Sequence, residues 1–354
     1  MQKIMILFCL VFLLCSIAAF AENSPTEPAN NQIKIGVSIP LTGAQSFLGE
    51  GMRNAVILAK EELDRENRLQ FIFEDDGFVA KNAVSAVNKL ITADHINGLI
   101  IFGSSTSLAI GNLVEEHKIP TLALATTEKA SEGKNYIVRH FLNPRIENQF
   151  VSDEVKRRKY ESVAVLTTTQ DGVLALHDMF LKNPPCKVVF DKEYNPDEKD
   201  FLTAVAQIKR LNPSAVYLLL LSPQGAIFAK HLRSAGYKGE FFSAHQLEDP
   251  AEVKLADGAL LCMWYVNGDT RAASGFMQRY KARFGEDARN YGPGFYDMAK
   301  LMIEGTKTSD LNKYLHTVQN FEGSLGKYSA TDNNAFALPH MLKVVTEKGF
   351  EGMR

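Results

Sequence analysis

Two clusters of small hydroxyl residues each follow an apolar run of the sequence. Gly103-Ser104-Ser105-Thr106 follows residues 98–102, and Ala125-Thr126-Thr127 follows residues 120–124. Hydroxyl groups, and the free N–H groups at the start of a helix, can donate hydrogen bonds to a carboxylate. The same residue types also cap helices and form turns, and capping explains Ser105 as well as ligand contact does. The clusters therefore indicate either local turn chemistry or one shared anion site.

Patterns that support catalysis or metal binding do not accompany these hydroxyl residues. No serine lies in a G-x-S-x-G sequence, and neither a P-loop nor a complete dinucleotide fingerprint is present. The eight histidines form no H-E-x-x-H or Cys/His cluster. Asp75-Asp76-Gly77 is interpreted as a solvated turn rather than a metal or acid pair. We expect no catalytic residue, no metal and no cofactor, and therefore not an enzyme.

Apolar strands alternate with amphipathic helices along the chain. In the first half, strands are expected at 33–40, 69–73, 98–102 and 120–124, with helices at 49–67, 81–97 and 105–117. The pattern then repeats, with strands at 162–167, 187–190, 215–221 and 240–243 and helices near 174–181, 201–211 and 223–235. Ser222-Pro223 is expected to start the last of these helices as its N-cap and first residue.

This alternation predicts an α/β protein with two parallel sheets, each covered on both faces by helices. Two successive sheets predict two lobes. Open α/β sheets bind ligands at the carboxyl ends of their strands, which is where both hydroxyl clusters lie. The elements thus place both clusters at one crevice.

The N-terminal residues indicate export. Lys3 precedes an apolar run over residues 4–20, and Ala19-Phe20-Ala21 is a small-x-small cleavage pattern. The run is short for a membrane span, which needs ~20 apolar residues. We expect a signal peptide at 1–21, a disordered leader at 22–32 and a periplasmic location. A membrane anchor, or a lipoprotein attached through Cys15, is the alternative.

The amino-acid composition argues against some classes of binding partner. The net charge of −2 does not favour nucleic acid or an anionic membrane surface. Cys186 and Cys262 would remain after cleavage, and they are either free thiols or one bridge.

Six segments, in chain order, resemble type I periplasmic solute-binding proteins of the Leu/Ile/Val-binding branch that serves ABC importers. They begin with IKIGVSIPLTGAQSFLGEGMRNAVILAKEEL at 33–63, and the others are residues 73–91, 98–113, 198–218, 276–285 and 321–334. The resemblance implies two Rossmann-like lobes joined by a three-strand hinge, with the ligand in the cleft between them. The implied bounds are 33–139 plus 267–328 for lobe 1 and 141–264 plus 332–354 for lobe 2, with the third crossover near 329–332.

The resemblance also implies the partners. They are a small amino-acid-like, carboxylate or amide solute, enclosed when the lobes close, and an inner-membrane ABC permease complex. A monomer is expected. The alternative is a periplasmic sensing module that uses the same fold to regulate a membrane receptor or an envelope enzyme.

The ligand site follows from the resemblance position by position. The residues assigned to it are Leu48, Ser104, Ser105, Ala125, Thr126, Asp171, Leu221, His245 and Tyr291. Ser104, Ser105 and Thr126 fall on the carboxylate-binding elements, although Thr126 could simply begin a turn. Tyr291 falls on an aromatic wall position, and a place in the core is its alternative.

Several site positions depart from the family. His245 stands where an acid is expected to bind the ligand ammonium, and a neutral imidazole is a poor partner for a buried ammonium. Leu48, Asp171 and Leu221 likewise replace residues that the family's amino-acid binders carry. The expected ligand is therefore a small carboxylate or amide rather than leucine or isoleucine, unless Asp171 or Glu248 supplies the missing charge.

Overall fold

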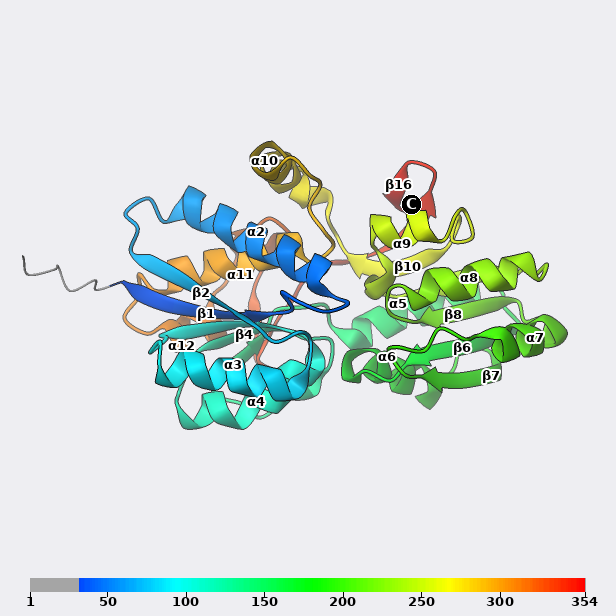
Figure 1. The fold of residues 1–354 in the computed structure, drawn as a ribbon, viewed down its shortest axis with the longest axis horizontal. Helices are drawn as coiled ribbons and strands as arrows, with labels where there is room; N and C mark the ends of the chain where they lie inside the picture. The colour runs from blue at the N-terminus through cyan, green and yellow to red at the C-terminus, as the bar shows by residue number, and fades with distance from the viewer. Residues whose placement is uncertain (1–31, 354) are drawn as a thin grey trace, which may run out of the picture. The chain divides into compact units, whose positions relative to one another are not determined.

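The first sheet of the computed structural model, which describes residues 32–353, combines strands from residues 33–139 with two short strands from residues 330–336 (Figure 1). The strand order is β13-β14-β5-β4-β3-β1-β2. The strands are β1 Ile33–Ile39, β2 Leu69–Asp75, β3 Gly98–Phe102, β4 Thr121–Leu124, β5 Ile137–Arg139, β13 Ala330–Thr331 and β14 Ala335–Phe336. Strands β1 to β5 are parallel, so the ends of β3 and β4 lie at the same edge.

Helices cover both faces of this sheet. Helices α2 (Ser46–Leu63) and α11 (Gly292–Gly305) pack together on one face, and α3 (Ala80–Thr92) and α4 (Ser104–Glu116) pack on the other (Figure 1). Two apolar clusters fill the layers, one with α2 and α11 and one with α3 and α4. The remaining elements of this lobe are α10 Ser274–Phe284, α12 Leu311–Thr317, β11 Phe321–Gly323, β12 Gly326–Tyr328, η1 Glu128–Ala130 and η3 Arg271–Ala273.

The second sheet has the order β16-β15-β10-β9-β8-β6-β7. Its strands are β6 Ser162–Thr168, β7 Lys187–Tyr194, β8 Ala215–Leu219, β9 Glu240–Ser243, β10 Trp264–Gly268, β15 His340–Thr346 and β16 Gly349–Gly352. The helices are α5 Pro144–Arg157, α6 Asp171–Lys182, α7 Leu202–Leu211, α8 Gln224–Ser234, α9 Pro250–Leu255 and η2 His245–Leu247. Apolar side chains of α5 and α6 fill one face, and those of α7 and α8 fill the other. The predicted fold, two Rossmann-like α/β lobes, is confirmed.

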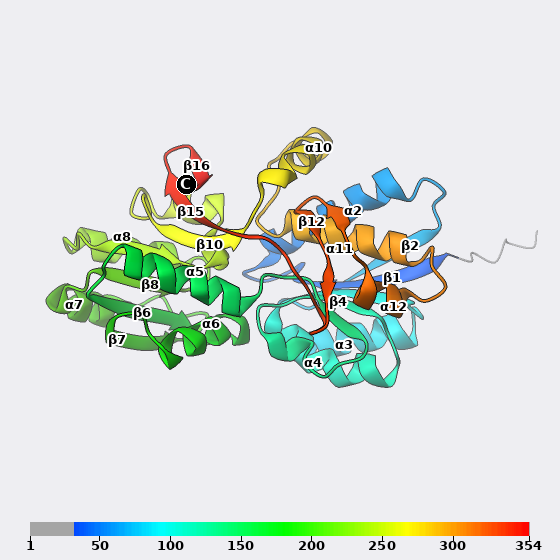
Figure 2. The same cartoon turned by 180° about the vertical axis from the view of Figure 1, so that it is seen from behind.

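The chain passes between the two sheets after β5, after β10 and after β14, and Figure 2 shows the last passage as the red segment that leads into β15. The third passage comes later than the sequence predicts. Residues 330–336 still belong to the first sheet, because Ala335 pairs with Arg139 and the Arg139 N–H donates to the Asn334 carbonyl at 2.8 Å. Such short strands carry too few residues to show a period.

Two local predictions are corrected. The Ser222 hydroxyl caps no helix; it donates to Glu252 Oε2 at 2.7 Å, and α8 begins two residues later. Asp76 is fully buried rather than solvated, with its carboxylate accepting from the Ser38 hydroxyl at 2.7 Å and the Phe78 N–H at 2.8 Å. Burial raises the pKa of Asp76. The Asp75-Asp76 turn therefore ties the end of β2 to β1.

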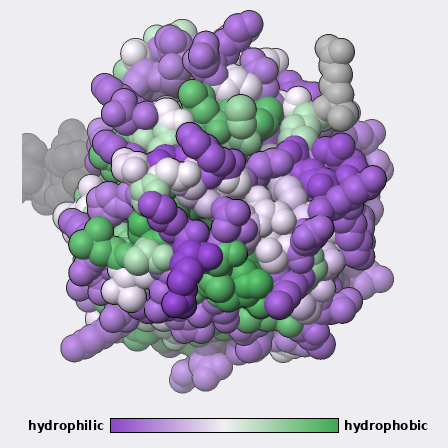
Figure 3. Space-filling view, turned by 90° about the vertical axis from the view of Figure 1, so that its right-hand side faces the viewer, coloured by the Kyte–Doolittle hydropathy of each residue, from purple (hydrophilic) through white to green (hydrophobic). Residues whose placement is uncertain are grey.

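Other predictions concern the surface and the ends of the chain. The expected signal peptide and nearly all of the leader lie outside the described residues. Among residues 32–353, no helix is both long and apolar enough to cross a membrane. Cys186 and Cys262 are free thiols. On the face drawn in Figure 3, hydrophilic residues predominate and the hydrophobic areas are small and separate.

Candidate functional site

A cavity of about 60 Å³ lies where the carboxyl ends of strands from both sheets meet. About 670 Å³ around it is free of protein atoms when its open mouth is included. Its walls follow β3 and β4 of the first sheet and β6, β8 and β9 of the second. The lining residues that follow these strands include Gly103, Ser104, Thr126, Gln170, Leu221 and His245. This cavity, called the cleft below, is the candidate binding site.

Ser104 joins the two hydroxyl clusters. Its Oγ accepts from the Thr126 N–H at 3.0 Å and from the Thr127 N–H at 3.3 Å, so both acceptor sites of the hydroxyl are used. The preceding Gly103 has φ +98°, and a Cβ there would lie 2.5 Å from the Phe78 ring. Glycine is therefore required to bring the start of α4 against the cleft. The Ser104 proton is left to donate into the cleft.

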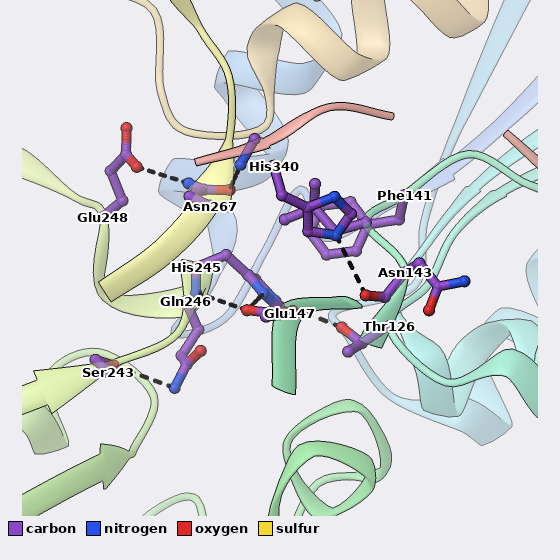
Figure 4. Close-up of polar contacts among 12 residues, drawn as sticks. Thr126, Phe141, Asn143, Glu147, Ser243, His245, Gln246, Glu248, Asn267 and His340 are labelled. Atoms are coloured by element: carbon purple, nitrogen blue, oxygen red, sulfur yellow. Dashed lines mark hydrogen bonds and ion pairs between the residues drawn. The ribbon is translucent and has the colours of Figure 1, made fainter. Parts of the chain in front are cut away.

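Thr126 connects this side of the cleft to His245 (Figure 4). Thr126 Oγ1 lies 3.4 Å from His245 Nε2, and the other ring nitrogen, Nδ1, lies 3.0 Å from Glu147 Oε1. The His245 ring also packs edge-on against Phe141, with ring centroids 4.7 Å apart. Asn290 holds the His245 carbonyl through a 2.8 Å bond from Nδ2. Three contacts thus fix the imidazole ring, and a fourth fixes the His245 backbone.

Glu147, which contacts His245 behind the cleft, was not singled out in the sequence analysis. It lies in the first turn of α5 and is fully buried. Asn143 caps the helix by accepting from the Arg145 N–H, and Pro144 follows the cap. An acid in the first turn of such a helix is common, because it interacts favourably with the helix dipole, so the sequence around Glu147 looks ordinary. Its burial depends on the approach of η2, which is about 100 residues away in sequence. No local signal could have identified it.

Aromatic rings form one wall of the cleft. Tyr291 packs against Phe102 and Phe141, with ring centroids 5.0 and 6.0 Å away, and Phe78 stacks on Phe102 at 5.3 Å. Burial, and then the negative charges of Glu147 and nearby acids, raise the pKa of the Tyr291 hydroxyl. Tyr291 therefore remains a neutral phenol. The wall can contact the apolar body of a ligand.

The two acids that line the cleft, Glu248 and Asp249, are paired with bases, and Asp171 lies outside the cleft. Glu248 lines the cleft, but Lys343 Nζ donates to both of its carboxylate oxygens at 2.9 and 3.0 Å. Asp249 lies 3.5 Å from Arg289 Nη1. Asp171, the first residue of α6, is exposed and does not line the cleft.

Six of the nine predicted site residues line the cleft, and these are Leu48, Ser104, Thr126, Leu221, His245 and Tyr291. Ser105 lies beside it and accepts from Gln170 Nε2 at 3.2 Å, a contact between the two lobes. Ala125 is buried, with its carbonyl accepting from Arg139 Nη1 at 3.3 Å. Among residues 32–353, no group of three or more His, Cys, Asp or Glu side chains could hold a metal ion.

Comparison with known proteins agrees with this geometry. Residues 32–344 match the model of the periplasmic binding protein family. The Leu/Ile/Val-binding protein homolog 2 of Brucella abortus (strain 2308) is 24% identical over 250 residues, which are 67% of this chain. That match spans 65%, just under two thirds, of the relative. The Leu/Ile/Val-binding protein of Escherichia coli (strain K12) is 27% identical over 253 residues, 69% of this chain and 67% of the relative.

Solved structures share the whole two-lobed fold. A leucine binding protein from Thermotoga maritima superposes with a TM-score of 0.85 at 19% identity, over 91% of this chain and 98% of that one. A solute binding protein of an ABC transporter from Rhodopseudomonas palustris, in complex with benzoate, gives 0.81 at 17% identity, over 91% and 95%. The resemblance expected from the sequence is confirmed: the curated relatives of this chain are Leu/Ile/Val-binding proteins, and the chain belongs to the periplasmic binding protein family.

Proposed function

We propose that the protein is a periplasmic receptor of an ABC importer, which closes its two lobes over a small solute that carries a carboxylate or amide group. The observation that carries this proposal is the cleft itself. It lies at the carboxyl ends of strands from both sheets, and it brings the Ser104 and Thr126 hydroxyls to the start of α4. Concave sites with a few placed polar groups are the usual form of small-molecule sites.

The polar end of the cleft suits an oxygen-bearing group. Ser104 has a hydroxyl proton to donate, and α4 begins there with a 13-residue helix behind it. The N-terminus of a helix favours negative charge, and hydrogen bonds to charged groups are the stronger ones. A carboxylate, or the carbonyl of an amide, would accept these hydrogen bonds.

The rest of the cleft suits an uncharged body. Leu48, Leu221, Phe78 and Tyr291 supply apolar surface, and the cleft acids Glu248 and Asp249 are paired with Lys343 and Arg289. A buried ammonium without a paired acid costs several kcal/mol. The fold accommodates ligands with and without an ammonium group, since related structures hold isoleucine in one case and benzoate in another. In this chain the cleft favours the ligand without one.

Thermal unfolding of ligand-free, refolded protein tests the proposal with a panel of carboxylates, primary amides and α-amino acids. A ligand that binds only the native state at 100 times its Kd stabilises it by about 2.7 kcal/mol. We expect a saturable rise in Tm with at least one carboxylate or amide. A panel in which only α-amino acids raise the Tm would contradict the ligand class, and a panel with no effect would contradict the receptor function.

A further inference from the structure

Glu147 and His245 form a buried pair at the back of the cleft, and the close-up shows the histidine between the carboxylate and Thr126 (Figure 4). We propose that Glu147 holds His245 as an imidazolium whose Nε2–H faces Thr126 and the cleft, so that Glu147, which does not line the cleft, determines that the ligand is an anion. The inference rests on the proposed function and specifies the charge of its ligand. Glu147 is in this sense a positioning residue.

The first step concerns the surroundings of the Glu147 carboxylate. The side chain is fully buried, and its Oε1 meets both His245 Nδ1 at 3.0 Å and the His245 N–H at 3.4 Å. Its other oxygen, Oε2, has no hydrogen-bond partner. A buried carboxylate needs a countercharge in contact with it, or its desolvation costs several kcal/mol. His245 is the residue that makes this contact, so a proton on its ring neutralises the pair.

The second step concerns the direction of the hydrogen bonds. An imidazolium donates from both ring nitrogens: from Nδ1 to Glu147 and from Nε2 to Thr126 Oγ1 at 3.4 Å. Thr126 then accepts from the ring and has its own proton free for the cleft. With a neutral ring, Thr126 would instead donate to Nε2 and present its lone pairs to the ligand. The proton on His245 therefore makes Thr126 a donor, as Ser104 already is.

The third step concerns the other titratable and charged groups on the elements around the pair. They are Arg139 at the end of β5, His340 and Lys343 on β15, Glu248 and Asp249 after η2, and Arg289 before α11. Arg139 is buried, and its Nη1 donates to the carbonyls of Ala125, Phe141 and Leu142 rather than to Glu147. Burial lowers the pKa of His340, which favours its neutral form.

The acids of this set are matched by bases: Glu248 by Lys343 and Asp249 by Arg289. With His245 protonated, Glu147 is matched as well. The described side chains around the cleft then offer donors and no unmatched negative charge. An anion is complementary to such a site, whereas an ammonium group is not.

Nitrogen-15 spectra of the histidine rings test the pair without knowledge of the natural ligand. In purified full-length exported protein, long-range proton–nitrogen correlations show which ring nitrogens carry a proton, and His245→Gln identifies the His245 signals by their loss. At pH 7 we expect both nitrogens of His245 to be protonated. In Glu147→Gln the ring should be neutral at the same pH, because the amide carries no charge. Asp153→Asn, which removes an exposed charge from the same helix, should leave the signals unchanged.

Two small probe ions then test whether the site prefers an anion or a cation. Acetate should shift the His245 and Thr126 resonances saturably, and methylammonium should not. A neutral His245 in the wild-type protein at pH 7 would overturn the inference, even if Glu147→Gln fails to fold. So would a response to methylammonium alone, or to neither probe. None of these results depends on the solute panel, so the receptor function could stand while this inference fails.

Discussion

At the scale of single residues, the site depends on which hydrogen bonds the Ser104 and Thr126 hydroxyls do not already make within the protein. Ser104 Oγ uses its two acceptor positions on the Thr126 and Thr127 N–H groups, so it holds the two strand-end loops together as well as facing the cleft. Thr126 Oγ1 hydrogen-bonds to His245 and to no other described side chain, so it can form a further hydrogen bond to a ligand. Thr126 is the better residue for a test, because its removal leaves the loop contact intact.

We expect Thr126→Val to weaken binding of the carboxylate or amide found in the solute panel by roughly tenfold to one hundredfold. Valine keeps the shape but removes a donor, and a hydrogen bond to a charged group contributes about 1.5–3 kcal/mol. Calorimetric titration measures the change. Thr126→Ser should retain most of the affinity, and Thr127→Val, one residue along the same loop, serves as the control. Unchanged affinity in Thr126→Val would place the polar end of the ligand elsewhere.

At the scale of elements, the approach of α6 to α4 limits how far the lobes can close. Gly172, the second residue of α6, packs so tightly that a Cβ there would lie 2.8 Å from Ser104 Oγ and 3.2 Å from Thr126 Oγ1. Both of those atoms belong to the other lobe. A side chain at position 172 would therefore hold the lobes apart.

Gly172→Ala is expected to lower ligand affinity at least tenfold without lowering the Tm of the ligand-free protein. Alanine favours a helix over glycine by about 1 kcal/mol, so a loss of binding could not be attributed to unfolding. Gly275→Ala is the matched control, because Gly275 is the exposed second residue of α10 and lies outside the cleft lining. Equal affinity in the two variants would show that α6 and α4 do not need this close contact.

The elements also show why prediction from the sequence succeeded in part. The strands and helices that the sequence analysis named lie within about five residues of their predicted bounds, because their spacing reflects burial directly, whereas α5, α10, α11 and β15 were not predicted. Short elements were not: β14 is two residues long and depends on pairing with β5 across the chain. Glu147 was not predicted for the same reason, because it is distinguished from other acids by its contact with His245, 98 positions away in the sequence. Local patterns do not record contacts between distant segments.

At the scale of the whole molecule, a buried polar chain anchors the first passage between the lobes. His140 Nε2 lies 2.9 Å from the Tyr328 hydroxyl, which donates to Asp297 Oδ2 at 2.9 Å. Burial lowers the pKa of His140 to about 3 and raises that of Asp297. The two groups thus affect the pH dependence of stability in opposite directions.

Protonation of His140 should contribute to acid unfolding. Between its ordinary pKa of 6.5 and about 3, the unfolded state binds a proton that the native state does not, so the free energy of unfolding falls as the pH falls. The slope from one such group is at most about 1.4 kcal/mol per pH unit. Urea unfolding of His140→Gln between pH 4 and 7 should show a shallower slope than wild type. The exposed His117→Gln provides the control, and equal slopes in wild type and His140→Gln would contradict this role.

The central claim is that the cleft holds a small solute with a carboxylate or amide group and no ammonium. Native mass spectrometry of protein isolated from the periplasm under gentle conditions tests it most directly, because a bound solute is detected and then fragmented without prior selection. We predict a 1:1 complex whose released ligand is a carboxylic acid or amide without a primary amine, and which is diminished in Thr126→Val. Release of leucine, isoleucine, valine or another α-amino acid would contradict the claim.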